Sequence, residues 1–198
     1  KSGLWGLGME SWLKELSKEG SLEQEYIASV IDSYYGLWEP YTESPGGMWG
    51  GYCAKTREDV GEKDPMGQAV LESFLPAHIN QMMRLDPSFK GDFFMTRDKA
   101  LPYTAKSQYL QDIILTGANS SNISANLLNN VLMGNSGNNR IDGKEGYDIV
   151  QFRGSLNEYE ISEKDGAIIV RDSIPGRDGV DTLVSVEILR FTDLDIDA

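Results

Sequence analysis

A nine-residue period runs through the middle of the chain and constrains the fold more than any other feature. Apolar residues recur at this spacing, and they are Ile123, Leu132, Ile141 and Val150. An Asn or Asp precedes each of the last three by two residues, at Asn130, Asn139 and Asp148. Glycines keep the same spacing, in the pairs Gly134 with Gly143 and Gly137 with Gly146. Because four classes of position share one period, the segment predicts a repeating coil rather than a helix or an ordinary alternating strand.

The physical form of such a period is a parallel β-roll. Each nonad supplies one turn and one short strand, so two nonads close a flat coil of about eighteen residues. The apolar residues then point inward and stack on those of the neighbouring coils, while glycines allow turn conformations with φ > 0. Side chains eighteen residues apart face one another, which pairs Asn130 with Asp148 and Asn139 with Asn157.

Oxygen atoms at the turns make calcium the partner to test. Ca²⁺ prefers carboxylate and carbonyl oxygens at about 2.3–2.6 Å. The candidate ligands lie in or next to the turns, and they are Asp148, Asn130, Asn139, Asn135, Gly137 and Gly146. Only Asp148 among them is charged, so we expect about one Ca²⁺ ion near it. The alternative is a metal-free coil in which the Asn side chains form a hydrogen-bonded ladder from turn to turn.

Residues 134–150 resemble the haemolysin-type (RTX) calcium-binding repeat, whose pattern is Gly-Gly-x-Gly-x-Asp-x-apolar-x. The resemblance extends over about residues 115–196, because the segments 148–152, 159–161, 168–172, 179–183 and 186–191 are similar to the closing strands of such proteins. The second glycine of the pattern is replaced by Asn135 and Lys144, and its Asp by Asn130 and Asn139. The resemblance implies a roll finished by antiparallel strands, bound calcium, and a secreted, extracellular bacterial protein.

The first half of the chain reads as helical. Apolar spacing predicts helices over about residues 9–16, 21–36 and 64–75, with a capping box at Ser21 and an N-cap at Asp64 before Pro65. Ile79, Met82 and Met83 suggest that the last helix continues to about residue 84. We expect residues 36–63 to form a long loop, residues 57–64 to be a solvated charged stretch, and residues 93–95 and 109–115 to be short strands.

The long loop carries four aromatic residues among its glycines, namely Trp38, Tyr41, Trp49 and Tyr52. Such rings either bind a flat ligand such as carbohydrate or form the core of a small domain. Glu39, Glu43 and His78 are the candidates for a hydrolytic site, although each has a simpler structural explanation. The layout of this half resembles the C-terminal part of secreted bacterial hydrolases such as zinc metallopeptidases. Their His-Glu-x-x-His motif is absent here, so a catalytic domain would lie upstream.

Composition narrows the possible functions. The 198 residues include 31 acidic and 18 basic side chains, a formal net charge of −13 that argues against a nucleic-acid partner. One cysteine and one histidine exclude an internal disulfide, a cysteine-rich zinc site and a two-histidine hydrolase motif. No apolar run is long enough to span a membrane. The chain starts at Lys1 without a signal-peptide pattern, so we expect a mature product or an excised piece.

Together these observations predict an α+β protein. Residues 1–108 form a small α-helical subdomain, and residues 109–198 form a short parallel β-roll with an antiparallel closing segment. The expected function is that of a calcium-binding, calcium-stabilised C-terminal module of a secreted bacterial protein, without catalytic activity of its own. The alternatives are a fragment of a secreted hydrolase whose catalytic motif lies upstream, and a carbohydrate-binding adhesin module.

Overall fold

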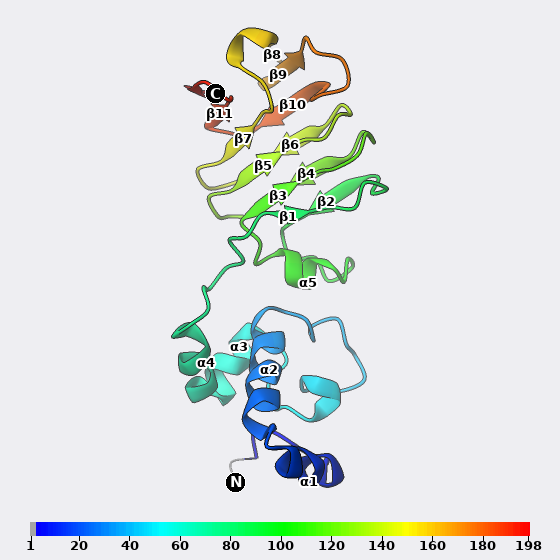
Figure 1. Cartoon of the computed structure of the whole chain (residues 1–198), viewed down its shortest axis with the longest axis vertical. Coiled ribbons are helices and arrows are strands. Elements are labelled where there is room, and N and C mark those ends of the chain that lie inside the picture. The colour runs from blue at the N-terminus through cyan, green and yellow to red at the C-terminus, as the bar shows by residue number, and fades with distance from the viewer. Residues whose placement is uncertain (1–2) are drawn as a thin grey trace. The chain divides into compact units, whose positions relative to one another are not determined.

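A computed structural model describes residues 3–198, and the chain divides into two compact units. Unit 1 comprises residues 1–77 and 98–106 and contains most of the helices; unit 2 comprises residues 78–97 and 107–198 and contains two mixed six-stranded sheets (Figure 1). The protein is therefore of mixed α/β type, as predicted. Residues 78–97 belong to unit 2, whereas the sequence analysis assigned them to the helical segment.

The helices predicted from apolar spacing are present as α1 (Glu10–Glu19), α2 (Leu22–Tyr34) and α4 (Pro65–Glu72). The remaining helical elements are the 3-10 helix η1 (Met48–Gly50), α3 (Arg57–Lys63), α5 (Thr104–Ser107) and the 3-10 helix η2 (Leu156–Glu158). Asp64 caps α4 as expected, because its carboxylate accepts a hydrogen bond from the backbone N–H of Gly67 at 3.0 Å. Ser21 does not cap α2, since its hydroxyl makes no capping hydrogen bond.

The prediction of a long loop over residues 36–63 is wrong for residues 57–63. The segment forms α3, which starts with a capping box in which the hydroxyl of Thr56 accepts from the N–H of Asp59 at 3.1 Å. Asp64 is also buried rather than solvated, and the hydroxyls of Tyr26 and Tyr52 donate to its carboxylate at 2.6 and 2.8 Å. Buried hydrogen bonds of this kind join residues 38 and 12 positions apart and leave no short-range signal.

The predicted helix through residues 79–84 is also wrong. Met83 and Arg84 form strand β1 (Met83–Arg84), which pairs in parallel with β3 (Asp112–Ile114). Pro76 removes a backbone donor and ends the preceding helix. The long-range pairing with β3 then satisfies the backbone that a helix would otherwise have satisfied internally.

The other strands of the repeat are β2 (Asp92–Phe94), β4 (Asn122–Ser124), β5 (Val131–Met133), β6 (Arg140–Asp142) and β7 (Ile149–Gln151). From β1 to β7, strands that follow one another along the chain belong to different sheets: β1, β3, β5 and β7 to one sheet, and β2, β4 and β6 to the other. Each strand from β1 to β5 pairs in parallel with the strand two further on. The Cα register joins Ile123 to Ile141 and Leu132 to Val150, a step of two nonads.

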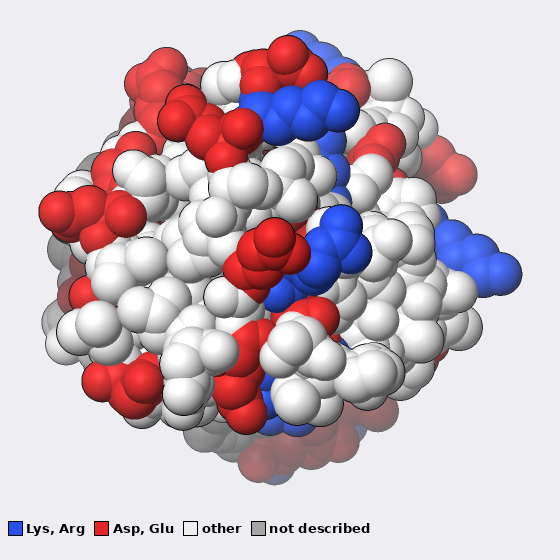
Figure 2. All heavy atoms as spheres, turned by 90° about the horizontal axis from the view of Figure 1, so that it is seen from above, with Lys and Arg blue, Asp and Glu red and all other residues white. Residues whose placement is uncertain are grey.

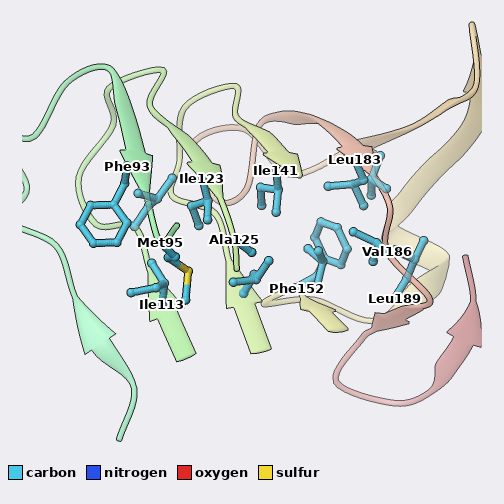
Figure 3. Close-up of a cluster of buried hydrophobic side chains, with 14 of the residues drawn as sticks. Phe93, Met95, Ile113, Ile123, Ala125, Ile141, Phe152, Leu183, Val186 and Leu189 are labelled. Atoms are coloured by element: carbon cyan, nitrogen blue, oxygen red, sulfur yellow. The ribbon is translucent and has the colours of Figure 1, made fainter. Parts of the chain in front are cut away.

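The core of unit 2 lies between the two sheets (Figure 3). The four periodic apolar residues are fully buried there, which confirms their predicted burial, and the strand pairing separates them into two rows. Ile123, Ile141 and Leu183 are neighbours in one sheet, and Leu132, Val150 and Leu189 are neighbours in the other. Each such side chain contributes about 1.5–3 kcal/mol by leaving water.

An antiparallel excursion interrupts the repeat after β7. Strands β8 (Tyr159–Lys164) and β9 (Ala167–Asp172) form a hairpin that pairs with β10 (Val180–Val184). The chain then returns, and β10 pairs in parallel with β6 while β11 (Ile188–Arg190) pairs in parallel with β7. Strand β12 (Asp195–Asp197) pairs antiparallel with β11 at the end of the sheet that contains β7. Because of this excursion, Asp181 and not Asn157 lies against Asn139, so the expected pairing of Asn139 with Asn157 is wrong.

Because the apolar rows are buried between the sheets, truncating a side chain in a row is expected to lower the free energy of unfolding more than truncating an exposed apolar side chain. Ile141→Ala leaves a cavity between the sheets and is expected to lower the free energy of unfolding of unit 2 by about 2–5 kcal/mol. Leu194→Ala, at a side chain that is 52% exposed, is expected to change it by less than about 0.5 kcal/mol. Urea denaturation followed by far-ultraviolet circular dichroism measures both, and similar values for the two variants would contradict this core.

Candidate metal centre between the turns

Along both edges of the two sheets, side chains of one turn accept hydrogen bonds from the backbone of a neighbouring turn. At one edge, Asp148 Oδ1 accepts from the backbone N–H of Asn130 at 2.8 Å, and Glu187 Oε2 accepts from that of Asp148 at 2.7 Å. At the other edge, Asp181 Oδ1 accepts from the backbone N–H of Asn139 at 2.9 Å. Asn130, Asn139, Asp148 and Asp181 are all buried. The carboxylates are therefore part of a continuous polar ladder.

The two Asn residues of this ladder perform a task that Asp cannot. Asn130 Nδ2 donates to the carbonyl of Gln111 at 2.6 Å, and Asn139 Nδ2 donates to that of Ser121 at 2.7 Å. An ionised carboxylate has no donor for these carbonyls. The departures from the repeat pattern at Asn130 and Asn139 thus have a structural reason.

A second periodic position places donors between the coils. Asn126 Nδ2 donates to the carbonyl of Leu110 at 2.8 Å, and Asn135 Nδ2 donates to those of Thr116 and Asn119 at 3.1 and 2.9 Å. The equivalent positions nine and eighteen residues after Asn135 are Lys144 and Arg153. Arg153 donates to the carbonyl of Gly134 at 2.6 Å.

Lys144 is the exception in this series. Its backbone is left-handed, with φ 71°, and its ammonium pairs with Asp142 at 2.9 Å on the surface. The turn of residues 143–148 therefore contributes no side-chain donor from this position to the coil beneath it. This difference separates that turn from the turn of residues 134–139.

At the edge of Asp148, two buried oxygen atoms have no hydrogen-bond partner among residues 3–198, namely Asn130 Oδ1 and Asp148 Oδ2. At the other edge the equivalent oxygen, Asn139 Oδ1, accepts from the backbone N–H of Asn135 at 2.9 Å. A Cβ at position 143 would collide with Asp148 Oδ2 and with the carbonyl oxygen of Ser185, so only glycine fits there. A bound cation or a proton would satisfy acceptor oxygens that have no hydrogen-bond donor.

The electrostatics of both edges favour such a cation or proton. Burial raises the pKa of Asp148 to about 6; the N–H of Asn130 opposes this, and the charges of Glu187 and Asp142 add to it. Burial likewise raises the pKa of Asp181 to about 8, opposed by the N–H of Asn139 and supported by the charge of Asp178. Each carboxyl is therefore costly to ionise in the folded protein without a positive partner.

The structure brings together only part of the predicted ligand set. Asp148 and Asn130 are in contact, and Gly146 lies against the carbonyl of Leu128 in the turn below. Asn135, Gly137 and Asn139 belong to the turn at the other end of β6. Within residues 3–198, no cluster of three or more His, Cys, Asp or Glu side chains suits a metal ion. An ion at Asp148 would therefore depend on amide and carbonyl oxygens as well as on this carboxylate.

Glu187 and Asp181 are the residues that sequence reasoning missed. Each stands two positions before a buried apolar residue, Leu189 or Leu183, as Asp148 stands before Val150. That spacing is a signal, but the β8–β9 excursion removes it from the nine-residue register. Pattern matching limited to an unbroken period therefore does not detect it.

The aromatic candidates of unit 1 are divided by their burial. Tyr52 is fully buried and donates to Asp64, so it belongs to the core. Trp38 meets Tyr41 and Trp49 edge to face, at ring-centroid distances of 5.7 and 4.9 Å, and Trp49 is 64% exposed. This contact makes Trp38 and Trp49 a pair at the surface of unit 1.

The candidates for hydrolysis do not form a single group within one unit. The carboxylate of Glu43 accepts from the hydroxyl of Tyr41 at 3.1 Å, and both Glu39 and Glu43 belong to unit 1. His78 belongs to unit 2. The two glutamates therefore share a unit to which His78 does not belong.

Comparison of the chain with protein-family models and with curated proteins finds no match. Among the described residues, none of the helices combines the length and the apolar character needed to cross a bilayer. Asp and Glu side chains are scattered over the face seen in Figure 2, with Lys and Arg among them rather than gathered in one basic patch.

The raised pKa values predict that the metal-free protein loses stability as pH rises from about 4 to 8. In this window the folded state retains protons on Asp148 and Asp181 that the unfolded state, with a pKa of 3.8, has released, so the free energy of unfolding falls with pH. Asp181→Asn is expected to flatten the part between about pH 6 and 8. Thermal melts in a chelating buffer measure this.

The exposed Asp165, in the turn between β8 and β9, provides the matched control. Asp165→Asn is expected to leave the slope between pH 6 and 8 unchanged. Stability that rises with pH in this window in the unmodified protein would contradict the assignment of protons to the two buried carboxyls.

Proposed function

We propose that residues 109–198 form a parallel β-roll with an antiparallel closing segment, and that this roll binds one Ca²⁺ ion between the turns 125–130 and 143–148. The chain then acts as a calcium-stabilised C-terminal module of a secreted protein of bacterial type. The observation that carries the proposal is the pair of buried, unpaired oxygens, Asn130 Oδ1 and Asp148 Oδ2, on adjacent turns.

The strand arrangement supports the roll. From β1 to β7 the strands alternate between two sheets, and each strand from β1 to β5 pairs in parallel with the strand two further along the chain. A register of two nonads per coil follows from the pairs Ile123 with Ile141 and Leu132 with Val150. This is the geometry that a nine-residue repeat with one turn and one strand per nonad produces.

The donor atoms support calcium in particular. All of them are hard oxygens, which suits Ca²⁺ and not the softer metals that need Cys or His. Asp148 and Asn130 would hold the ion through their side chains, and the carbonyl oxygen of Ser185 and Asp148 Oδ2 both lie against the backbone of Gly143. Glu187, which accepts the backbone N–H of Asp148, adds a second negative charge beside the site. When bound, calcium supplies the positive charge that ionised Asp148 otherwise lacks.

The hydrogen-bond ladder supports a single ion. In the turn 134–139, the side-chain amides of Asn135 and Asn139 donate hydrogen bonds to carbonyls of the coil below. The guanidinium of Arg153, from the coil above, donates to the carbonyl of Gly134. We therefore assign Asn135, Gly137 and Asn139 to the metal-free part of the roll. Binding energy at the remaining site becomes folding energy, because the unfolded chain has no preformed site.

The proposal predicts a calcium-dependent rise in stability that requires the Asp148 carboxylate. At 100 times the dissociation constant, a single site adds about 2.7 kcal/mol to the free energy of unfolding. Asp148→Asn keeps the shape and the acceptor for Asn130 but removes the charge, so the rise is expected to disappear. Calorimetric melts with millimolar CaCl₂ and with chelator measure it.

Asp165→Asn serves as the control for a general loss of negative charge and is expected to keep the full calcium shift. A melting temperature of unit 2 that is equal in calcium and in chelator would overturn the metal site and favour the metal-free ladder. An undiminished calcium shift in Asp148→Asn would place the ion elsewhere.

A further inference from the structure

A cavity of about 700 Å³ lies within unit 1, whereas the calcium site of the proposed function belongs to unit 2. It is formed by the N-terminal turn of α1, one face of α2, and η1 with the preceding loop. Its aromatic walls are Trp12, Trp38 and Trp49. Its charged side chains are all acidic, namely Glu10, Glu25 and Asp32.

The aromatic walls meet at an angle. Trp38 and Trp49 contact each other edge to face, with an interplanar angle of 73°, so they form a corner and not a flat platform. Trp12 lies on the side of α1 and contacts Trp5 at a centroid distance of 5.3 Å. The faces of such rings carry negative electrostatic potential and attract cations that approach from the cavity.

Trp49 is held in a conformation that L-residues seldom adopt. Its φ is 52° and that of Met48 is 49°, both in the left-handed region, within a turn fixed by the hydrogen bonds Gly50 N to Gly47 O and Gly51 N to Met48 O. The turn presents a large ring that is 64% exposed. A strained backbone that displays an exposed aromatic ring at the rim of a cavity points to a ligand.

The carboxylates lack a basic partner. Glu25 and Asp32 lie seven residues apart on α2 and so share one helical face, and Glu10 faces the cavity from the first turn of α1. No Lys or Arg lines the cavity, and in the described part of the chain none of the three carboxylates has an ion-pair partner. Burial raises the pKa of Asp32, and a hydrogen bond from the side chain of Trp38 opposes this, so the carboxyl of Asp32 lies beside one of the aromatic walls.

We infer that this cavity binds a small organic cation, a quaternary ammonium group that sits in the corner of Trp38 and Trp49 opposite the carboxylates of Glu25 and Asp32. Three carboxylates with no basic side chain complement a positive charge, and two rings at an angle enclose a rounded head group. A carbohydrate would instead stack on a flat ring face. This site is independent of the calcium-binding roll.

The test compares choline with 3,3-dimethylbutan-1-ol, which has nearly the same shape without the charge. Isothermal titration of the full chain with each probe is expected to show choline bound at least tenfold more tightly. Trp49→Ala and Asp32→Asn are each expected to weaken choline binding about tenfold, since one removes a ring face and the other a charge. Trp49→Phe, which keeps an aromatic ring, is expected to retain most of the affinity.

Phe74→Ala is the matched control, because Phe74 is 57% exposed on unit 1 and does not line the cavity. It is expected to bind choline like the unmodified chain. Equal affinity for the two probes, absence of choline binding at millimolar concentration, or binding of oligosaccharides of N-acetylglucosamine in place of choline would each overturn the inference.

Discussion

The hydrogen bond between one turn and the next is the interaction on which unit 2 depends. Parallel coils place the N–H and C=O groups of successive turns above one another, away from water, and each of these groups needs a partner. The carboxylates of Asp148 and Asp181 accept hydrogen bonds from the backbone N–H groups of Asn130 and Asn139. The side-chain amides of those two Asn residues donate to carbonyls of the coil below. Together with the parallel pairing of the strands, this ladder keeps the coils in the register in which the apolar rows stack.

The ladder has an electrostatic cost that differs between its two edges. A buried carboxylate that accepts a single N–H is poorly compensated, and burial accordingly raises the pKa values of Asp148 and Asp181. Near Asp148 two oxygens also lack donors, whereas the turn of Asn139 is supplied with amide groups. The two edges therefore carry similar buried carboxyls but differ in their donors, since only the turn of Asn139 has a donor for its amide oxygen.

The sequence predicts the repeat well because its period is local. The buried positions, the short strands of residues 122–151 and the contact of Asn130 with Asp148 all follow from a spacing of nine. What it could not predict depends on long-range pairing: β1 forms because β3 is present, and Asp181 replaces Asn157 because the β8–β9 hairpin intervenes. In unit 1, α3 has a local signal in Thr56 and Asp59, but the burial of Asp64 depends on two distant tyrosines.

The most direct test of the account is the map of backbone amide shifts on addition of calcium, recorded by ¹⁵N–¹H nuclear magnetic resonance on the full chain. The account predicts large changes confined to the turns 125–130 and 143–148 and to residues 185–187. Residues 116–119 and 134–139, where amide groups already fill the space between coils, are predicted to change little. Calcium-induced changes centred on that second group of turns, or none at either edge, would contradict the claim that a single edge of the ladder is built to receive a cation.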